Sequence, residues 1–185
     1  ALVGPNGSGK STLLRSLARL HAPDTGRILI GDDNLLDAAE HSAREFARDV
    51  TLFAQSRIAP AGLSVREIVE FGRHPYRKRF AGMSAQDRDA VNRAMAVTGI
   101  SDMASRPASQ LSGGEVQRVW LACCLAQETG IVLLDEPTNH LDLRYQTEIL
   151  DLILDLSQEI GAAVGVVLHD LDQAARVADT VALLA

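Results

Sequence analysis

Short apolar runs along the chain predict strands that are covered on both faces. Two of them, Ile131 to Leu134 and Ala163 to Leu168, lack the polar alternation of a half-exposed strand. Between them, apolar residues recur at helical spacing and stop before Gly161, a glycine suited to a helix C-terminus. These apolar positions are Leu143, Ile149, Leu150, Ile153, Leu154 and Leu156. The order strand, helix, strand predicts a βαβ unit in a parallel sheet.

The two ends of the chain carry similar patterns. Ala1 to Val3 is typical of the last part of a buried strand, and Arg27 to Ile30 and Thr180 to Ala185 predict two more strands. A helix is expected after Gly9 and should end shortly before Pro23. Its predicted apolar face contains Leu13, Leu14, Leu17 and Leu20. Because the first residue is not Met and the terminal strands start and stop abruptly, we expect a fragment clipped at both ends.

The middle of the chain differs in both pattern and charge. Between residues 56 and 110, apolar residues follow helical spacing in two groups, Val65 with Ile68 and Val69, and Val91 with Met95. This segment has nine Lys or Arg against five Asp or Glu, so its net charge is +4 and the rest of the chain, out of a total of -6, has -10. We therefore predict one α/β domain with a core over 1–55 and 111–185 and a helical subdomain inserted over 56–110.

Composition limits the class of protein. The chain has 185 residues, of which 46% are hydrophobic and 23% charged, enough for one domain with its own core. No apolar run approaches the 18 residues of a membrane-spanning helix. The only cysteines, Cys123 and Cys124, are adjacent in an apolar segment and predict buried thiols instead of a disulfide framework or a metal site.

A glycine-rich segment predicts a nucleotide-binding loop. Residues 4–12 fit the pattern G-x-x-x-x-G-K-[ST] between a strand end and a helix start. They are Gly4, Pro5, Asn6, Gly7, Ser8, Gly9, Lys10, Ser11 and Thr12. The glycines let backbone N–H groups face phosphate oxygens, and the helix N-terminus adds its positive end. Lys10 would supply charge to the β and γ phosphates, and the Ser11 hydroxyl would ligate Mg²⁺.

A pair of acids follows the apolar run Ile131 to Leu134. Asp135 and Glu136 would lie at the C-terminal end of a parallel strand, where side chains point into the ligand crevice. Asp135 is suited to hold Mg²⁺ through water, and Glu136 to orient or deprotonate an attacking water. This pair supports the nucleotide interpretation of the loop.

Residues 111–117, LSGGEVQ, resemble the LSGGQ-type signature of ATP-binding cassette proteins, with Glu115 at the position that is often Gln. Other elements of that family follow in its usual order. Gln55 after Val50 to Ala54 matches the glutamine loop, Leu141-Asp142 the D-loop, and His169 the switch histidine. The resemblance covers nearly the whole chain and implies a P-loop NTPase of the RecA-like α/β class, with a parallel sheet flanked by helices.

The resemblance also implies a mechanism with ATP and Mg²⁺ as cofactors. In cassette ATPases two subunits face head to tail, and each ATP lies between one subunit's phosphate loop and the other's signature, here Ser112, Gly113 and Gly114. Glu136, His169 and Gln55 would be catalytic, Ser11, Gln55 and Asp135 would serve the metal, and Asp142 would contribute to the nucleotide site. A homodimer is the expected assembly. In this family an aromatic residue before the phosphate loop stacks on adenine, and since we expect a clipped fragment, we also expect it to be deficient in adenine binding.

Several segments resemble a subgroup of these ATPases. Phe71 to Tyr76 and the stretches around Asp135 and His169 are similar to ATPases of bacterial importers for iron–siderophore complexes, haem and vitamin B12, with the ferric-siderophore group foremost. This subgroup implies transmembrane permease subunits as partners, a substrate-binding protein acting indirectly, and a peripheral position at the cytoplasmic face of the bacterial inner membrane. Specificity for the chelate would reside in those partners.

Two alternatives stay open. The chain could serve another importer or an exporter, or, from a different class, act with nucleic acid. About 100 residues between Lys10 and Ser112 leave no room for a long coiled coil, and the acidic net charge disfavours a phosphate-binding footprint, so no nucleic acid partner is expected.

The basic cluster in the helical insertion has two interpretations. It consists of Arg73, His74, Arg77, Lys78 and Arg79. It is either a solvated arm or a surface that meets the membrane subunit or anionic headgroups.

Overall fold

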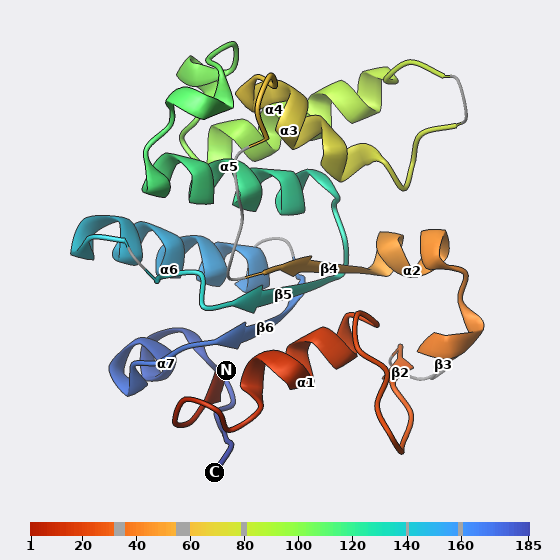
Figure 1. Cartoon of the computed structure of the whole chain (residues 1–185), viewed down its shortest axis with the longest axis vertical. Coiled ribbons are helices and arrows are strands. Elements are labelled where there is room, and N and C mark those ends of the chain that lie inside the picture. The colour runs from red at the N-terminus through yellow and green to blue at the C-terminus, as the bar shows by residue number, and fades with distance from the viewer. Residues whose placement is uncertain (32–35, 55–59, 79–80, 140, 159–160) are drawn as a thin grey trace.

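The computed structural model describes residues 1–31, 36–54, 60–78, 81–139, 141–158 and 161–185. At its centre lies a parallel sheet of five strands in the order β4-β5-β6-β1-β7 (Figure 1). Their bounds are Val50–Phe53 for β4, Ile131–Asp135 for β5, Ala163–Val167 for β6, Leu2–Val3 for β1 and Ala182–Leu183 for β7. The parallel βαβ arrangement of β5 and β6 confirms the prediction from their apolar runs.

Helices cover both faces of the sheet, and β5 shows why. Val132 and Leu134 belong to the core cluster under α5 (Gly113–Ala126) and α6 (Leu143–Gln158), whereas Leu133 packs in a second cluster with Leu14 of α1 (Lys10–Leu17). Successive side chains of a strand point to opposite faces, so a strand covered twice must be apolar throughout. In Figure 1, α5 and α6 lie above the sheet and α1 lies below it. Helix α7 (Leu171–Val177) packs beside α6, and its Ala174 belongs to the same core cluster as the buried residues of α6.

Shorter elements connect β1 to β4. An antiparallel pair, β2 (Leu29–Ile30) and β3 (Leu36–Asp37), is followed by the single turn η1 (Ala38–Glu40) and by α2 (Ala43–Asp49). Ser42 begins α2 with a capping box, because its hydroxyl accepts from the N–H of Glu45 while the Glu45 carboxylate accepts from the N–H of Ser42. These elements end at the edge strand of the sheet, β4.

A helical arm forms the upper layer of Figure 1. Its elements are α3 (Val65–Glu70), η2 (Phe71–Arg73), α4 (Ala85–Val97), η3 (Ser101–Met103) and η4 (Ala108–Gln110). Val65, Ile68, Val69, Val91 and Met95 are buried in one cluster of this arm, as their spacing predicts. The same cluster contains Val119, Ala122 and Ala126 of α5, so α5 belongs to the cores of both the arm and the sheet. The proposed boundary at residues 110 and 111 therefore stays a prediction.

Three details of the expected elements are wrong. Leu20 lies beyond the end of α1 and is 70% exposed, because the chain turns at Arg19 with a φ of 57°. Leu143 is 79% exposed at the first position of α6, and the buried residues of that helix begin only at Ile149. The strand expected over 27–30 covers only Leu29 and Ile30. The spacing of apolar residues predicts that a helix forms, but it does not show which of those residues are buried.

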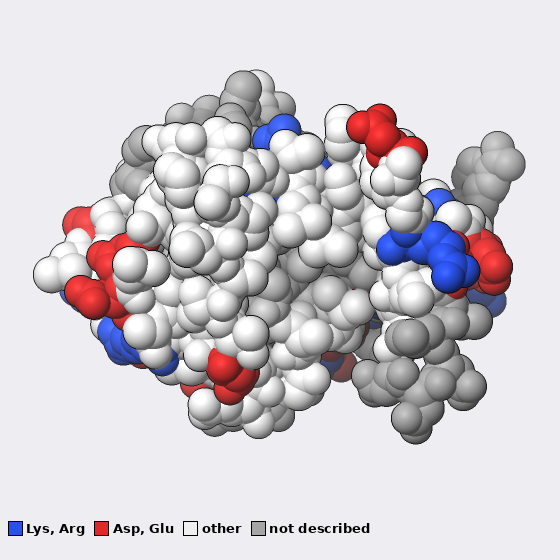
Figure 2. Space-filling model, turned by 90° about the horizontal axis from the view of Figure 1, so that it is seen from below, with Lys and Arg blue, Asp and Glu red and all other residues white. Residues whose placement is uncertain are grey.

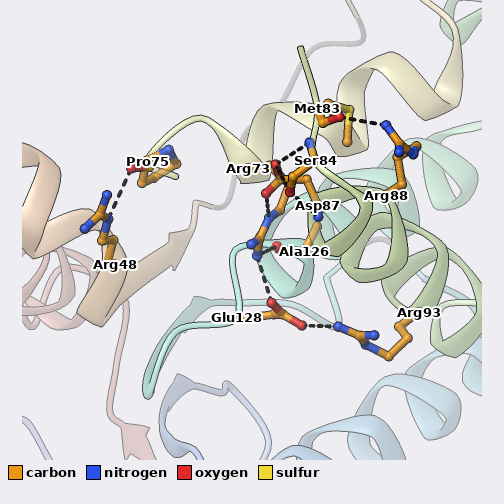
Figure 3. A network of polar contacts seen from close by, with 10 residues as sticks. All are labelled: Arg48, Arg73, Pro75, Met83, Ser84, Asp87, Arg88, Arg93, Ala126 and Glu128. Carbon is orange, nitrogen blue, oxygen red and sulfur yellow. Dashed lines mark hydrogen bonds and ion pairs between the residues drawn. The ribbon is translucent and has the colours of Figure 1, made fainter. Parts of the chain in front are cut away.

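The basic cluster of the arm divides into two kinds of residue. His74, Arg77 and Lys78 are exposed, but Arg73 is only 1% exposed and does not belong to a surface cluster. Arg79, the fifth member of the predicted cluster, lies outside the described residues. Arg73 Nε donates to Asp87 Oδ1 at 2.9 Å, and its NH1 group donates to the Ala126 carbonyl at 2.8 Å and to Glu128 Oε2 at 2.9 Å (Figure 3). Arg93 binds the other oxygen of Glu128 at 2.6 Å. Thus Arg73 joins α4 to the end of α5.

The face seen from below carries its charged residues mainly near the rim, around a wide uncharged area (Figure 2). Helix α7 and strand β7 lie at this end of the molecule in Figure 1, and they include the exposed residues Leu171 and Leu183. Across the described part of the chain, no helix combines the length and the apolar character needed to cross a membrane. Cys123 and Cys124 are both buried, as expected.

Candidate nucleotide site

The glycine-rich loop lies between β1 and α1, at the C-terminal edge of the parallel sheet. Gly9 caps α1 with a φ of 93°, in the left-handed region, where a glycine is preferred because it has no Cβ. Gly4 serves a different purpose, because a Cβ there would lie 2.1 Å from the Leu184 carbonyl oxygen. The backbone of the loop thus depends on Gly9 for its turn and on Gly4 for close packing beside β7.

Lys10 is buried at the start of α1 and faces back onto its own loop. Its Nζ donates to the carbonyl oxygens of Gly4 at 2.9 Å and Pro5 at 2.8 Å. An ammonium group has three donors, so one remains for an anion held in the loop. The loop and the helix N-terminus together give this edge of the sheet a positive character that suits phosphate.

Ser11 and Asp135 meet although 124 residues separate them. The Ser11 hydroxyl donates to Asp135 Oδ1 at 2.8 Å, which joins the first turn of α1 to the end of β5. Asp135 is 1% exposed, and its Oδ2 has no hydrogen-bond partner among the described residues. A buried carboxylate oxygen without a partner is costly. A hydroxyl beside a carboxylate is a donor set that Mg²⁺ prefers, so these residues fit that ion.

Glu136 is held from two sides. His169 Nε2 lies 2.6 Å from Glu136 Oε1, and the Asn139 side-chain amide donates to Glu136 Oε2. Glu136 is 8% exposed and has a φ of 53°, a left-handed conformation that costs of order 1–3 kcal/mol for a residue other than glycine. Such strain is typical of functional sites, where the surrounding contacts impose it. The backbone therefore turns the carboxylate away from the strand direction and toward His169.

These residues surround a cavity of about 470 Å³. It is lined by Asn6, Gly7, Gly9, Lys10, Ser11, Thr12, Glu136, Asn139 and His169. Three segments far apart in the sequence meet here because the C-terminal ends of β1, β5 and β6 lie side by side in the sheet. Crevices at this edge of a parallel sheet are the usual place for ligands.

The signature residues do not reach this cavity. Ser112 caps α5, and its hydroxyl and N–H are both bound by the carboxylate of Glu115 at 2.9 and 2.7 Å. These two bonds, together with the guanidinium of Arg106 3.0 Å away, keep the pKa of Glu115 below its usual range. The N–H groups of Gly113 and Gly114 at the first turn find no partner in the part of the chain that the structure describes. Two donors at the helix N-terminus thus stay available.

Two predicted site residues need separate mention. Gln55 lies outside the described residues. Asp142 is exposed, does not line the cavity, and accepts from the N–H of Tyr145 at 3.1 Å in the first turn of α6. The structure therefore brings the phosphate loop, Asp135, Glu136 and His169 together, but not Asp142 or the signature.

Asn139 is a residue of this site that the sequence analysis missed. It lines the cavity and binds Glu136, three positions before it in the chain. The only signal in the sequence was its position shortly after the acidic pair. That position does not indicate whether the Asn139 side chain points toward Glu136.

The comparisons with known proteins agree with this geometry. The sequence model of the family described as ABC transporter matches residues 1–139. The ferric enterobactin transport ATP-binding protein of Escherichia coli is 43% identical over 178 residues, or 96% of this chain and 65% of that protein. A probable siderophore transport system ATP-binding protein of Bacillus subtilis is 46% identical over 176 residues, or 95% of this chain and 63% of that protein. The chain thus spans about two thirds of the length of these relatives.

A solved structure extends the likeness to three dimensions. It is the ATP-binding cassette MJ0796, a dimer in a post-hydrolysis state bound to ADP and phosphate. It has a TM-score of 0.82 and 30% identity, and the alignment covers 99% of this chain and 79% of that one. The fold is therefore that of a P-loop NTPase cassette. With the family match over 139 residues, this shows that the chain belongs to the ABC transporter family.

Proposed function

We propose that this chain binds and hydrolyses ATP and that the hydrolysis powers import through a membrane permease. The observation that carries the proposal is the meeting of Lys10, Ser11, Asp135, Glu136 and His169 at one edge of the sheet, around or beside one cavity. The loop and Lys10 bind the phosphates, and Glu136 takes the proton of the attacking water. His169 and Asn139 orient the Glu136 carboxylate.

Mg²⁺ would be held by Ser11 and Asp135, and it would neutralise charge on the phosphates when bound. Gln55 is proposed as a further contact to the ion, from the resemblance alone. The metal-binding role rests on Asp135 Oδ2, for which the described residues supply no hydrogen-bond partner, and on the hydroxyl of Ser11 beside Asp135.

The experiment that tests the proposal is Glu136→Gln in the full-length protein. This variant keeps the shape of the side chain but removes the base, so ATP turnover should fall about 10²- to 10⁴-fold while ATP affinity is retained. Glu148→Gln, an exposed position on α6, is the matched control and should leave turnover unchanged. Near-normal turnover of Glu136→Gln would contradict the assignment of the base.

The proposed assembly is a head-to-tail homodimer. Its support is the pair of available N–H groups at Gly113 and Gly114, which lie outside the chain's own cavity and can bind a phosphate held by a second copy. Asp142 would act at this contact. ATP should convert the Glu136→Gln variant from monomer to dimer in size-exclusion chromatography with light scattering. A monomer at saturating ATP would argue against this arrangement.

The proposed cargo is an iron complex, with ferric siderophore first. This rests on the relatives, whose names include ferric enterobactin and siderophore transport. The chain would then be a peripheral subunit at the cytoplasmic face of the bacterial inner membrane, with permease subunits as partners and a substrate-binding protein acting indirectly. A deletion strain should lose uptake of labelled ferric siderophore and regain it with the wild-type protein but not with Glu136→Gln. Normal siderophore uptake in the deletion strain would contradict this cargo.

A further inference from the structure

A chain of side-chain amides connects the helix after His169 with both ends of the loop between β5 and α6. The Thr138 hydroxyl donates to Gln173 Oε1 at 3.1 Å, and Gln173 Nε2 donates to Gln146 Oε1 at 3.2 Å. Gln146 Nε2 then donates to the carbonyl oxygen of Leu141 at 3.0 Å. In each of the three bonds the donor lies on the Thr138 side and the acceptor on the Leu141 side. The series thus leads from Thr138, two residues after Glu136, to Leu141, the residue before Asp142. We call Thr138, Gln173, Gln146 and Leu141 the amide chain.

The chemistry of this arrangement requires glutamine at its two central positions. Each central side chain accepts from one neighbour and donates to the next, which an amide can do and a carboxylate or an apolar group cannot. Thr138 is 7% exposed, and both glutamines are half-buried, so the bonds are formed largely away from water. Bonds in such a series polarise one another, so the loss of one link weakens the others.

The amide chain lies where it can fix the site. Gln173 is on α7, which begins two residues after His169, and Asp170 caps that helix by accepting from the N–H of Asp172 at 2.7 Å. The position of α7 therefore determines where His169 meets Glu136. A further glutamine, Gln117 of α5, donates to the Pro137 carbonyl beside Thr138. Thus α5, α6 and α7 each send one amide to this loop.

Resting on the proposed function, we propose that Gln146 and Gln173 are positioning residues for ATP hydrolysis. Through Thr138 and Leu141 they hold the loop so that Glu136 keeps its strained conformation beside His169, and so that Asp142 keeps a set distance from Glu136. They do not touch the cavity, so they act through Glu136 and not on the nucleotide.

The test uses isosteric changes in the full-length protein. Gln173→Glu can still accept from Thr138 but cannot donate to Gln146, and Gln146→Glu cannot donate to Leu141. We expect each to lower kcat about 3- to 10-fold, with KM and ATP affinity within about twofold of wild type, because one net hydrogen bond is lost. The double variant should lose no more than the worse single variant, since the first break already interrupts the series. Gln86→Glu, exposed on α4, is the control.

Two further measurements separate positioning from simple stability. Thr138→Ser keeps the hydroxyl and should retain most of kcat, whereas Thr138→Val should behave like Gln173→Glu. The melting temperature should change by no more than a few degrees in all of these variants. Wild-type kcat in both glutamine variants, or additive losses that follow a lowered melting temperature, would overturn the inference.

A readout without activity distinguishes this inference from the proposed function. The N–H groups of Asn139 and Tyr145 donate to the Glu136 carbonyl and to Asp142 Oδ1, at the two ends of this loop. Amide hydrogen exchange at Asn139 and Tyr145 should become faster in Gln173→Glu and in Gln146→Glu, but not in Gln86→Glu. If the wild-type protein hydrolysed no ATP, the proposed function would fail, whereas unchanged exchange at these two amides would overturn the amide chain itself.

Discussion

Buried charged side chains are fully hydrogen-bonded in the helical arm but only partly hydrogen-bonded at the sheet edge. In the arm, Arg73 and Asp87 are almost fully buried and satisfy each other, with Ser84, Ala126 and Glu128 completing their hydrogen bonds. At the sheet edge, Lys10 and Asp135 are equally buried, but Lys10 binds only loop carbonyls and Asp135 leaves one oxygen without a partner in the described chain. Buried charged groups whose hydrogen bonds are all made within the protein have a structural role. Buried charged groups that keep an unused donor or acceptor indicate a place where a ligand can bind.

The largest effect is expected from breaking the complete network. Arg73→Ala leaves the buried Asp87 carboxylate without its cation, which typically costs about 3–5 kcal/mol in the free energy of unfolding. Urea denaturation monitored by circular dichroism measures this change. Arg77→Ala, an exposed arginine of the same segment, should change stability by less than about 0.5 kcal/mol. Equal stability of the two variants would show that the network of Figure 3 contributes little to folding.

The second effect concerns binding and not folding. Lys10→Ala removes the cation of the phosphate loop and should weaken ATP binding about 100-fold, since a hydrogen bond to a charged group is worth about 1.5–3 kcal/mol. Isothermal titration calorimetry with ATP measures it. The sequence has only one other lysine, Lys78, which is exposed in the arm, so Lys78→Ala is the natural control. Unchanged affinity in Lys10→Ala would remove this residue from the site.

A third change should stabilise the protein at the expense of function. Asp135→Asn puts a neutral amide in place of a buried carboxylate that has only part of its hydrogen bonds. In the absence of nucleotide, this change should raise the free energy of unfolding by about 1 kcal/mol. Wild-type protein should be more stable with ATP and Mg²⁺ than with ATP and a metal chelator, and this difference should disappear in Asp135→Asn. Thermal unfolding under both conditions tests this, with the exposed Asp155→Asn as control. A destabilised Asp135→Asn protein would mean that the charge is compensated after all.

The smallest effect is a pH dependence at the signature helix. Hydrogen bonds from Ser112 and the charge of Arg106 hold the pKa of Glu115 below its ordinary value of 4.5. A carboxyl whose pKa is lowered by folding stabilises the folded state above its unfolded pKa, and this contribution is lost as the pH falls through the lower folded value. The unfolding free energy of Glu115→Gln should therefore fall less than that of wild type when the pH is lowered below 4.5. Identical acid profiles would show that this capping box adds nothing to stability.

Much of the fold follows from patterns that are local in the sequence. The apolar runs at β5 and β6 and the glycine-rich loop before α1 each describe contiguous residues, and their backbone follows from composition and spacing. Charge counting predicted the arm as a separate subdomain, which stays a prediction, and it placed Arg73 with its exposed neighbours. Burial of a single arginine depends on Asp87 and Glu128, which lie 14 and 55 positions away.

By itself, the sequence determined the phosphate loop, the acidic strand end and the order of the family's motifs, because each of these is encoded by residues adjacent in the chain. Only the tertiary structure decided that Ser11 binds Asp135, that Glu136 adopts a left-handed conformation between His169 and Asn139, and that three glutamines converge on the following loop. The physical reason is that these contacts join separate segments across a parallel sheet. Their existence depends on strand order and on the direction of each side chain, which spacing along the chain does not specify.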